Sequence, residues 1–286
     1  MTTVCLSFDF DATSIWISTF KQVSAGPLSR GEYGARVGVG RVLELLQAKK
    51  VPATFFVPAH SATSFPEQAL GILNAGHEIG VHGYCHESPV GLTREQELAL
   101  LRRTVTKLKG VLGGAFAPVG YRSPASDLSS NTISVLEELG FLYDSSMSGD
   151  DFTPYWARRD DQADEEGFRQ GPGTSVLEIP FSWELDDFPY FSFLSRPLYP
   201  GLRSTDEVFR AWKEEFDYCH ARVIDGVYTL TMHPEIIGRG PRITMLGRFI
   251  DYMSEQSDVR FSTLAGEARR RRSVCHGSPQ DPSPLA

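Results

Sequence analysis

Residues 4–12 read VCLSFDFDA, an apolar run that ends in two aspartates placed two positions apart. Such a run is typical of a buried β-strand. Alternate residues of an extended backbone point to the same side, so the carboxylates of Asp9 and Asp11 share one face. One of them could bind a metal ion while the other takes a proton from a bound water. The stretch therefore predicts a strand of an α/β fold that ends at a reactive site.

A second stretch, residues 82–87, reads HGYCHE and follows a strand expected near residues 78–81. In a turn after a strand His82 and His86 can converge, because Gly83 permits a tight bend. An open divalent metal site needs about three protein ligands drawn from histidine and carboxylate. One aspartate of the first stretch and the two imidazoles supply that set. The two stretches together predict hydrolysis of an amide by metal-activated water.

Strand-like and helix-like patterns alternate along the chain, which implies a parallel sheet, either closed or doubly wound. No Pro/Gly/Ser-rich linker divides the sequence, so one barrel-like α/β domain over residues 1–268 is the economical organisation. Thr93 with Gln96, and Ser204 with Glu207, form capping-box patterns that begin two of the helices. The expected strands cover residues 4–8, 53–57, 78–81, 141–143, 176–179 and 227–231, and the expected helices cover residues 39–49, 67–75, 93–111, 131–139, 204–223 and 243–255.

Five polar residues fall at or just after expected strand ends, which is where barrels of parallel strands carry their sites. They are Asp9, Asp11, His82, Arg122 and His233. A guanidinium beside a base carboxylate orients it and lowers its pKa. A histidine whose pKa is near neutral can protonate a departing amine. We therefore expect Arg122 and His233 to complete a catalytic set with the aspartates and histidines.

Two segments differ in composition from the rest of the chain. Residues 149–173 are polar and charged and are expected to form a long insertion loop that could cover the site. Residues 269–286 begin with four arginines and continue as a Pro/Ser-rich stretch. This tail is expected to be disordered.

The charge balance and the apolar pattern exclude several partners. Lys and Arg total 28 against 36 Asp and Glu, a formal net charge of -8, which argues against nucleic acid because such binding rests on basic surface. The sequence contains no run of about 18 apolar residues that could span a membrane. The N-terminus lacks the basic and apolar regions of a signal peptide. A cytoplasmic protein with free thiols and no membrane partner is expected, and association into a homo-oligomer stays open.

In the order of its motifs the chain resembles the polysaccharide deacetylase family, which is defined by the NodB homology domain, over residues 3–266. SFDFD is similar to the acidic strand-end motif of the family, and HGYCH matches its H-x-x-x-H motif. Residues 122–124 match its Arg-x-Pro motif, and residues 230–234 match its Leu-x-x-His-Pro motif. The resemblance implies a distorted, incomplete β/α barrel.

The resemblance also implies roles for individual residues. Asp9 would be the base, Arg122 the residue that orients it, and His233 the acid. The implied ligands of one divalent ion, expected to be zinc, are Asp11, His82 and His86.

The sequence departs from the usual family pattern in two of these motifs. Phe10 separates aspartates that are adjacent in typical members, and Ala125 stands where many sugar deacetylases carry tyrosine. These departures resemble a branch that includes intracellular cyclic-imide hydrolases and atypical peptidoglycan-deacetylase-like proteins. The stretch FSWELDDFPYF is similar to that branch, in which Trp183 would line the pocket and either Asp186 or Asp187 would support His233.

The expected function is metal-dependent hydrolysis of a non-peptide carbon–nitrogen bond, as N-deacetylation of an amino sugar or its polymer. One alternative is the opening of a small cyclic imide or linear amide. A second alternative, from a different class, is a catalytically silent carbohydrate-binding protein. The complete set of acids and histidines argues against silence, because a silent domain has no physical need for it.

Overall fold

One sheet organises the part of the chain that the computed structural model describes, residues 1–195 and 198–274. Its strands follow the order β12-β1-β2-β3-β4-β5-β9-β6, and β13 also pairs with β1. The bounds are β1 (Thr2–Asp9), β2 (Ala53–Val57), β3 (Glu78–Val81), β4 (Gly120–Tyr121), β5 (Tyr143–Asp144), β6 (Tyr155–Arg158), β9 (Gly173–Glu178), β12 (Val227–Met232) and β13 (Val259–Phe261).

The pairing is parallel throughout the sheet except at the edge strand β6, which runs antiparallel to β9. The sheet curls into a barrel that is not closed by strand pairing. Within the described residues no ladder joins β6 to β12, although the backbone N–H of Val227 donates to the carbonyl of Phe152 (2.9 Å) across the gap. The expected distorted and incomplete β/α barrel is therefore confirmed.

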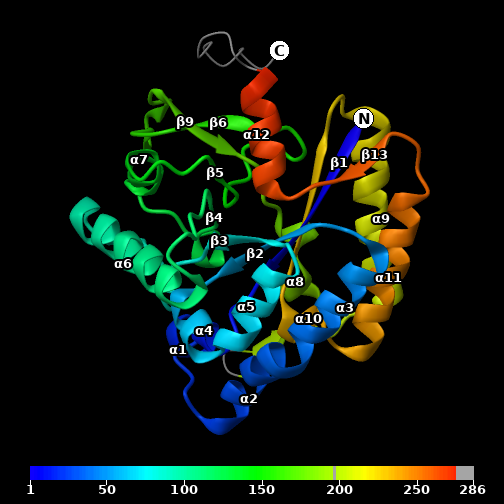
Figure 1. Cartoon of the computed structure of the whole chain (residues 1–286). Coiled ribbons are helices and arrows are strands. Elements are labelled where there is room, and N and C mark those ends of the chain that lie inside the picture. Colours follow the sequence, from blue (N-terminus) through cyan, green and yellow to red (C-terminus); the bar gives the residue numbers. More distant parts are fainter. Residues whose placement is uncertain (196–197, 275–286) are drawn as a thin grey trace.

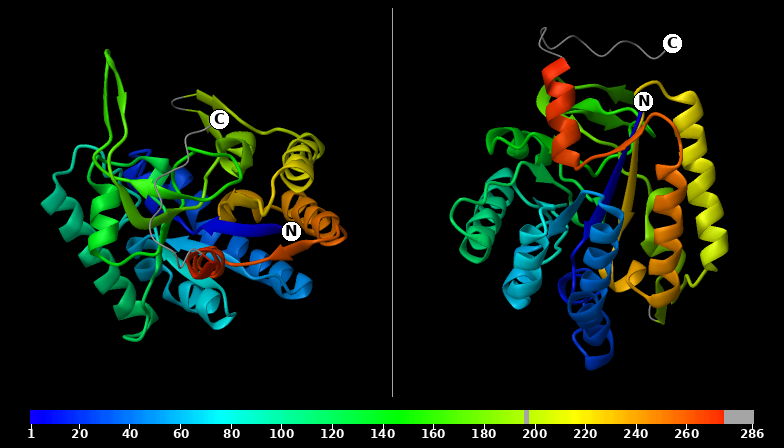
Figure 2. Two further views of the ribbon diagram at one scale, coloured as in Figure 1. Left: turned by 90° about the horizontal axis from the view of Figure 1, so that it is seen from above. Right: turned by 45° about the vertical axis from the view of Figure 1, so that its right-hand side comes forward.

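Helices cover the outside of the curled sheet, and every residue of β1 is buried, as expected of a central parallel strand. In Figures 1 and 2, α3, α9 and α11 flank one side of β1, and α4, α5 and α6 lie along the other part of the sheet. The helix bounds are α1 (Ser14–Ser18), α2 (Ala25–Tyr33), the π-helix η1 (Gly34–Gly38), α3 (Val39–Lys49), α4 (Ala59–Ser64), α5 (Pro66–Asn74), α6 (Arg94–Leu112), the 3₁₀ helix η2 (Pro124–Ser126), α7 (Thr132–Glu138), the 3₁₀ helix η3 (Trp183–Leu185), α8 (Asp187–Phe191), α9 (Thr205–Arg222), α10 (Pro234–Ile237), α11 (Gly240–Ser254) and α12 (Leu264–Val274).

Local sequence signals place the helix ends where the structure has them. Thr93 with Gln96 forms a complete capping box before α6, and Ser204 with Glu207 forms another before α9. Gly140 follows α7 with φ of 77°, a left-handed conformation that glycine adopts without steric cost. No described helix combines the length and the apolar character needed to cross a bilayer. Cys5, Cys85 and Cys219 are free thiols, and Cys275 lies outside the described residues.

The segment 149–173 is not a loop over the site, so that expectation was wrong. It contains β6 and a hairpin of two short exposed strands, β7 (Gln162–Asp164) and β8 (Gly167–Arg169). Because β9 begins at Gly173 and runs parallel to β5, the hairpin lies at the amino ends of the strands. The site residues Asp9, His82, Arg122 and His233 lie at the carboxyl ends of the strands. In Figure 1 these ends are opposite to the amino ends, where the hairpin lies. A polar composition is shared by exposed hairpins and loops, which is why the sequence did not separate them.

The expectation that residues 269–286 are disordered is wrong for residues 269–274, because these residues continue α12. Fully buried Glu267 accepts charged hydrogen bonds from Arg260, Arg270 and Arg271, so the arginine run is anchored to the domain. Residues 275–286, the remainder of the expected tail, lie outside the described residues.

A short hairpin and a short helix complete the carboxyl end of the barrel. Strands β10 (Phe193–Ser195) and β11 (Leu198–Pro200) pair antiparallel after α8. Helix α10 packs against the π-helix η1, where a Cβ on Gly38 would lie 2.1 Å from the carbonyl oxygen of Pro234. Glycine at this position therefore lets η1 approach the segment that follows His233.

Candidate active site

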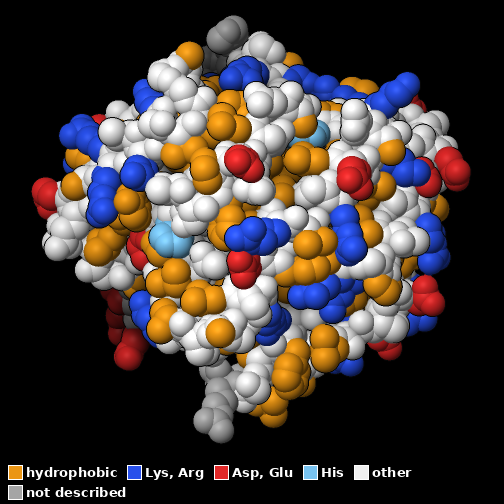
Figure 3. Space-filling model, turned by 60° about the horizontal axis from the view of Figure 1, so that its bottom comes forward, with side chains coloured by type: hydrophobic (Ala, Val, Ile, Leu, Met, Phe, Trp, Pro, Cys, Tyr) orange, Lys and Arg blue, Asp and Glu red, His pale blue; other side chains and the backbone are white. Residues whose placement is uncertain are grey.

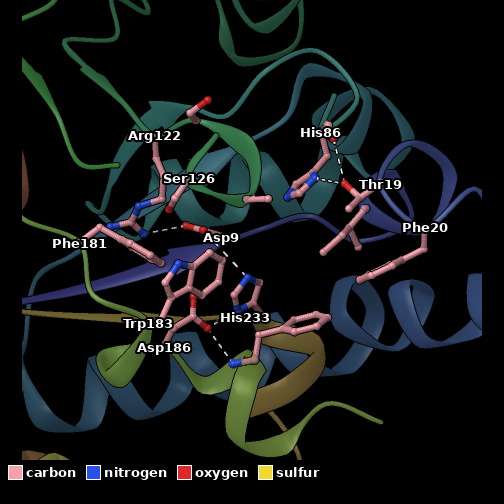
Figure 4. A pocket seen from close by; sticks show the side chains of 14 residues that line it. Asp9, Thr19, Phe20, His86, Arg122, Ser126, Phe181, Trp183, Asp186 and His233 are labelled. Atoms are coloured by element: carbon pink, nitrogen blue, oxygen red, sulfur yellow. Dashed lines mark hydrogen bonds and ion pairs between the residues drawn. The ribbon is translucent and has the colours of Figure 1, made fainter. Parts of the chain in front are cut away.

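The carboxyl ends of four strands bring the expected polar residues together. Asp9 is the last residue of β1, and His82, Arg122 and His233 directly follow β3, β4 and β12. The side chains of Asp9, Arg122 and His233 converge on a common space in Figure 4, with Phe181 and Trp183 at one side and Phe20 at the other. His82 Nε2 lies 3.6 Å from Asp9 Oδ2. All four polar residues are buried. The sequence-based placement at strand ends therefore agrees with the structure.

Asp11, His82 and His86 form a group that suits a divalent cation. One ligand atom from each lies within 4.8 Å of the others. His82 Nε2 lies 3.5 Å from Asp11 Oδ1, and His86 Nε2 lies 3.5 Å from Asp11 Oδ2. Both Asp11 oxygens and His82 Nε2 are buried without a hydrogen-bond partner among the described residues. Buried polar atoms are rarely left unpaired, so these atoms fit a bound metal ion.

The two imidazoles are held by their other nitrogen. His82 Nδ1 donates to the carbonyl oxygen of Arg122 (2.7 Å), and His86 Nδ1 lies 2.6 Å from Thr19 Oγ1. Burial lowers the pKa of His82 and lowers that of His86 further, which favours the neutral ring that binds metals. His86 has φ of 60°, an uncommon conformation for a non-glycine residue that costs on the order of 1–3 kcal/mol unless its surroundings hold it.

Asp9 is paired with Arg122 in the buried centre of the site. Arg122 Nη1 donates to Asp9 Oδ1 (2.9 Å) and to Ser7 Oγ (2.9 Å). Its Nε donates to the carbonyl oxygen of Ser145 (2.9 Å), which fixes the guanidinium plane. Burial alone would raise the pKa of Asp9, but Arg122 and the neighbouring imidazoles outweigh it and lower the pKa. Asp9 is therefore an ionised carboxylate suited to accept a proton.

His233 is supported by Asp187 and not by Asp186. Asp187 Oδ1 lies 2.7 Å from His233 Nδ1, and both carboxylate oxygens of Asp187 accept from the backbone N–H of His233 at 3.1 Å. Asp186 Oδ1 is 3.7 Å from the same ring nitrogen and accepts from the backbone N–H of Phe188 (2.7 Å), capping α8. The three groups also lie within metal-binding distance of one another, but these hydrogen bonds account for their closeness.

The charge state of His233 follows from its neighbours. Burial alone would lower the pKa of the imidazole, but the carboxylates of Asp186, Asp187 and Asp11 raise it well above its ordinary value. His233 Nε2 lies 3.8 Å from Asp11 Oδ2 and 4.0 Å from Asp9 Oδ2. Figure 4 shows His233 and Arg122 on different sides of Asp9. The raised pKa favours the protonated form of His233 beside these carboxylates.

A cavity of about 190 Å³ opens beside these groups. Trp183 lines it, as expected, and is 47% exposed at its rim. Asp186 lines it too, whereas Asp187 lies behind His233. The sequence did not identify several lining residues, because they lie in short helices or in connecting segments without a distinctive pattern. These residues are Ile15, Thr19, Phe20, Ser123, Ser126, Phe181 and Phe188.

The outer surface at this end of the molecule is mixed in character. Hydrophobic side chains are interspersed with those of Lys and Arg across the face shown in Figure 3. The aspartates of the site do not contribute to that face, because Asp9, Asp11, Asp186 and Asp187 are buried. The negative charge of the site is therefore confined to its interior.

Comparison with known proteins agrees with this geometry. The family model for polysaccharide deacetylase matches residues 30–143, which include His82, His86 and Arg122. The peptidoglycan deacetylase of Helicobacter pylori is 33% identical over 91% of this chain and 93% of its own. The peptidoglycan deacetylase-like protein FGM2 of Gibberella zeae is 33% identical over 93% of this chain and 85% of its own.

A crystal structure shows the same similarity in three dimensions. A Mycobacterium smegmatis protein assigned to the polysaccharide deacetylases superimposes with a TM-score of 0.83 and 33% identity, covering 100% of this chain and 94% of its own. The fold and the polar cluster define a hydrolase-type site at the mouth of an incomplete β/α barrel. The chain belongs to the polysaccharide deacetylase family. It is a deacetylase-like enzyme.

Proposed function

We propose that this protein is a metal-dependent N-deacetylase whose substrate is an N-acetylated amino sugar or its polymer. The observation that carries the proposal is the closeness of Asp9 and His233 to the group formed by Asp11, His82 and His86. Asp9 Oδ2 lies 3.6 Å from His82 Nε2, and His233 Nε2 lies 3.8 Å from Asp11 Oδ2. A base, an acid and a candidate metal group thus share one small space. The similarity to proteins named peptidoglycan deacetylases supports an N-acetylated sugar as the substrate.

Each side chain has a defined part in this proposal. A divalent ion bound to Asp11, His82 and His86 would polarise the acetyl carbonyl and lower the pKa of a water. Asp9, kept ionised by Arg122, accepts the proton of the attacking water.

His233 completes the reaction as the acid. It donates a proton to the nitrogen as the carbon–nitrogen bond breaks, which releases acetate and a free amine. Asp187 holds the Nδ1 side of the ring, so the proton to be donated is on Nε2 and faces the substrate. The raised pKa of His233 keeps that proton in place at neutral pH.

The size of the cavity supports a second candidate, hydrolysis of a small cyclic imide or linear amide. A site for a drug-sized ligand usually measures roughly 300–1,000 Å³, and a cavity of about 150 Å³ accepts a benzene ring. The cavity here, about 190 Å³, is in the range of one small ring. Aromatic walls from Phe20, Phe181, Trp183 and Phe188 suit the flat face of such a ring.

The experiment begins with the metal content of the purified protein and of a variant that carries both His82→Ala and His86→Ala. We expect about one divalent ion per chain in the wild type and loss of that ion in the variant, because one remaining ligand cannot hold it. Full occupancy in the variant would remove the proposed metal group.

The zinc-loaded wild type is then assayed on chitooligosaccharides, N-acetyl monosaccharides, hydantoins and succinimide, with the double variant as the matched control. Acetate release from an amino sugar is expected. Ring opening of succinimide or a hydantoin without acetate release would favour the second candidate. No turnover of any substrate by the zinc-loaded wild type, together with retained sugar binding, would favour a silent carbohydrate-binding protein.

A further inference from the structure

Thr19, a residue outside every motif of the sequence, contacts the candidate metal ligand His86 at two points. Its Oγ1 lies 2.6 Å from His86 Nδ1 and donates to the backbone carbonyl oxygen of His86 at 3.1 Å. Thr19 is the C-cap residue directly after α1 and lines the cavity, and Figure 4 shows its hydroxyl directed at the imidazole. The side chain thus joins the cavity wall to a residue of the candidate metal group.

The two contacts together favour one position for the proton of the imidazole ring. A threonine hydroxyl has one proton and lone pairs that accept, whereas a carbonyl oxygen only accepts. With the proton of Thr19 donated to the His86 carbonyl, the hydroxyl oxygen accepts from Nδ1–H, and both contacts are satisfied. In a neutral imidazole the other nitrogen then has a free lone pair. That nitrogen, Nε2, is the one that faces Asp11 Oδ2 at 3.5 Å.

One short unit of the chain, residues 11–19, contacts both ring nitrogens of His86. Asp11 faces Nε2, and Thr19, eight positions later, contacts Nδ1. The hydroxyls of Ser14 and Ser61 donate to the backbone carbonyl oxygen of Asp11 at 2.7 and 2.5 Å, which fixes the start of the unit. The backbone N–H of Thr19 donates to the carbonyl oxygen of Ile15 (3.0 Å), which fixes its end.

We propose that Thr19 is a positioning residue that holds His86 in the tautomer and orientation needed to bind a metal ion through Nε2. The inference rests on the proposed metal group. It explains how His86 keeps a left-handed backbone conformation, because the hydroxyl bonds both the ring and the carbonyl of that residue. His82 has the equivalent support from the carbonyl of Arg122, which can only accept.

The matched variants are Thr19→Val, which keeps the shape and loses the hydroxyl, and Thr19→Ser, which keeps the hydroxyl. Zinc affinity is measured by competition with a chromophoric chelator. Loss of a group that orients a metal-binding histidine typically weakens affinity roughly 10–100-fold, which is the expected effect of Thr19→Val. Thr19→Ser should stay within about threefold of the wild type, since its hydroxyl can make the same bonds.

A second measurement does not depend on the metal. The nitrogen chemical shifts of His86 in metal-free, histidine-labelled protein report the tautomer directly, and the signal is assigned by its loss in His86→Gln. The wild type and Thr19→Ser should carry the proton on Nδ1, and Thr19→Val should shift toward Nε2–H. A wild type with Nε2–H, or a Thr19→Val variant with unchanged tautomer and zinc affinity, would overturn the inference. Failure of the wild type to bind any divalent ion would instead overturn the proposed function.

Discussion

Asp187 and His233 are joined by three contacts: a 2.7 Å bond between Oδ1 and Nδ1, and two bonds of 3.1 Å from the histidine backbone N–H to the carboxylate. One carboxylate therefore fixes both the ring and the backbone of the candidate acid. Asp186, its neighbour in sequence, contributes charge without that contact. Orientation and charge are thus supplied to His233 by different residues.

Because Asp187 orients His233 and Asp186 contributes only charge, the variants Asp186→Asn and Asp187→Asn should have different pH profiles. Asp186→Asn removes a charge that raises the pKa of His233, so the pKa should fall. Because the protonated ring is the active form, activity is lost as pH rises through that pKa. The alkaline limb of kcat/KM should therefore move to lower pH while the plateau stays within a few-fold.

Asp187→Asn should also move the alkaline limb of kcat/KM to lower pH. It should in addition lower the plateau of kcat/KM roughly 10²- to 10⁴-fold, because the ring of His233 loses the group that orients it as well as a neighbouring negative charge. The measurement for both variants is kcat/KM from pH 5 to 10. A normal plateau in Asp187→Asn would contradict the orienting role.

The two aspartates of β1 should behave differently when each is changed to asparagine. Asp9→Asn should keep the metal ion and lose roughly 10²- to 10⁴-fold in rate, because general-base removal has that cost. Asp11→Asn should lose metal affinity first, since Asp11 faces both imidazoles. Metal titration and turnover of the same preparations separate the two effects. Exchanged phenotypes would mean that the base and the ligand must be reassigned.

Removal of the β7–β8 hairpin should leave catalysis intact. The backbone N–H of Arg159 donates to the carbonyl oxygen of Pro172 (3.1 Å), so the ends of the hairpin are close and residues 161–170 can be replaced by a short glycine turn. Metal content and kcat/KM should remain within about twofold of the wild type, because no residue of this segment lines the cavity. A tenfold loss of turnover with normal folding would instead support a role for residues 149–173 in covering the site.

A buried pair of acids predicts how stability depends on pH. Asp144 and Glu178 are register partners on β5 and β9, and both are fully buried. Burial raises the pKa of Asp144 to about 6 and raises that of Glu178 well above its ordinary value. The folded state thus keeps protons that the unfolded state releases above about pH 4. The contribution of this pair to stability should be largest in acid and be lost as pH rises through 6.

Glu178→Gln should reduce this loss, because the amide cannot ionise and its oxygen can accept from the backbone N–H groups of Ser146 and Met147, as Glu178 does. We expect urea unfolding at pH 8 to show a gain on the order of 1–3 kcal/mol over the wild type, with little difference at pH 5. Glu178→Ala, which lacks the hydrogen-bond acceptor, should be less stable than the wild type at both pH 5 and pH 8. A loss of stability in Glu178→Gln at pH 8 would contradict the interpretation.

The sequence predicted those parts of the fold that have a local physical cause. Alternating patterns and capping boxes located the central strands and the long helices, and strand ends located Asp9, Arg122 and His233. The conformation of residues 149–173 and 269–274 was missed. Pairing of β6 with β9, and of the arginines of α12 with Glu267, depends on partners distant in sequence.

The site was predicted less completely than the fold for a related reason. Adjacent Asp186 and Asp187 look equivalent in the sequence, and only the direction of α8 decides which one reaches His233. Thr19 has no signal at all, because a threonine at the end of a five-residue helix is common and its contact lies 67 residues away. Support of this kind depends on the folded geometry and not on a local pattern.

The pairing of β1 with β12 joins segments that lie far apart in the chain, since Phe8 lies opposite Met232 in the register. During synthesis, Asp9 emerges from the ribosome first and His233 more than two hundred residues later. Closing so long a loop is entropically costly and slow compared with local folding. A growing chain therefore carries candidate metal ligands long before it carries the acid. The complete candidate catalytic set first exists when β12 joins β1, so activity would report the pairing of segments that lie far apart in the chain.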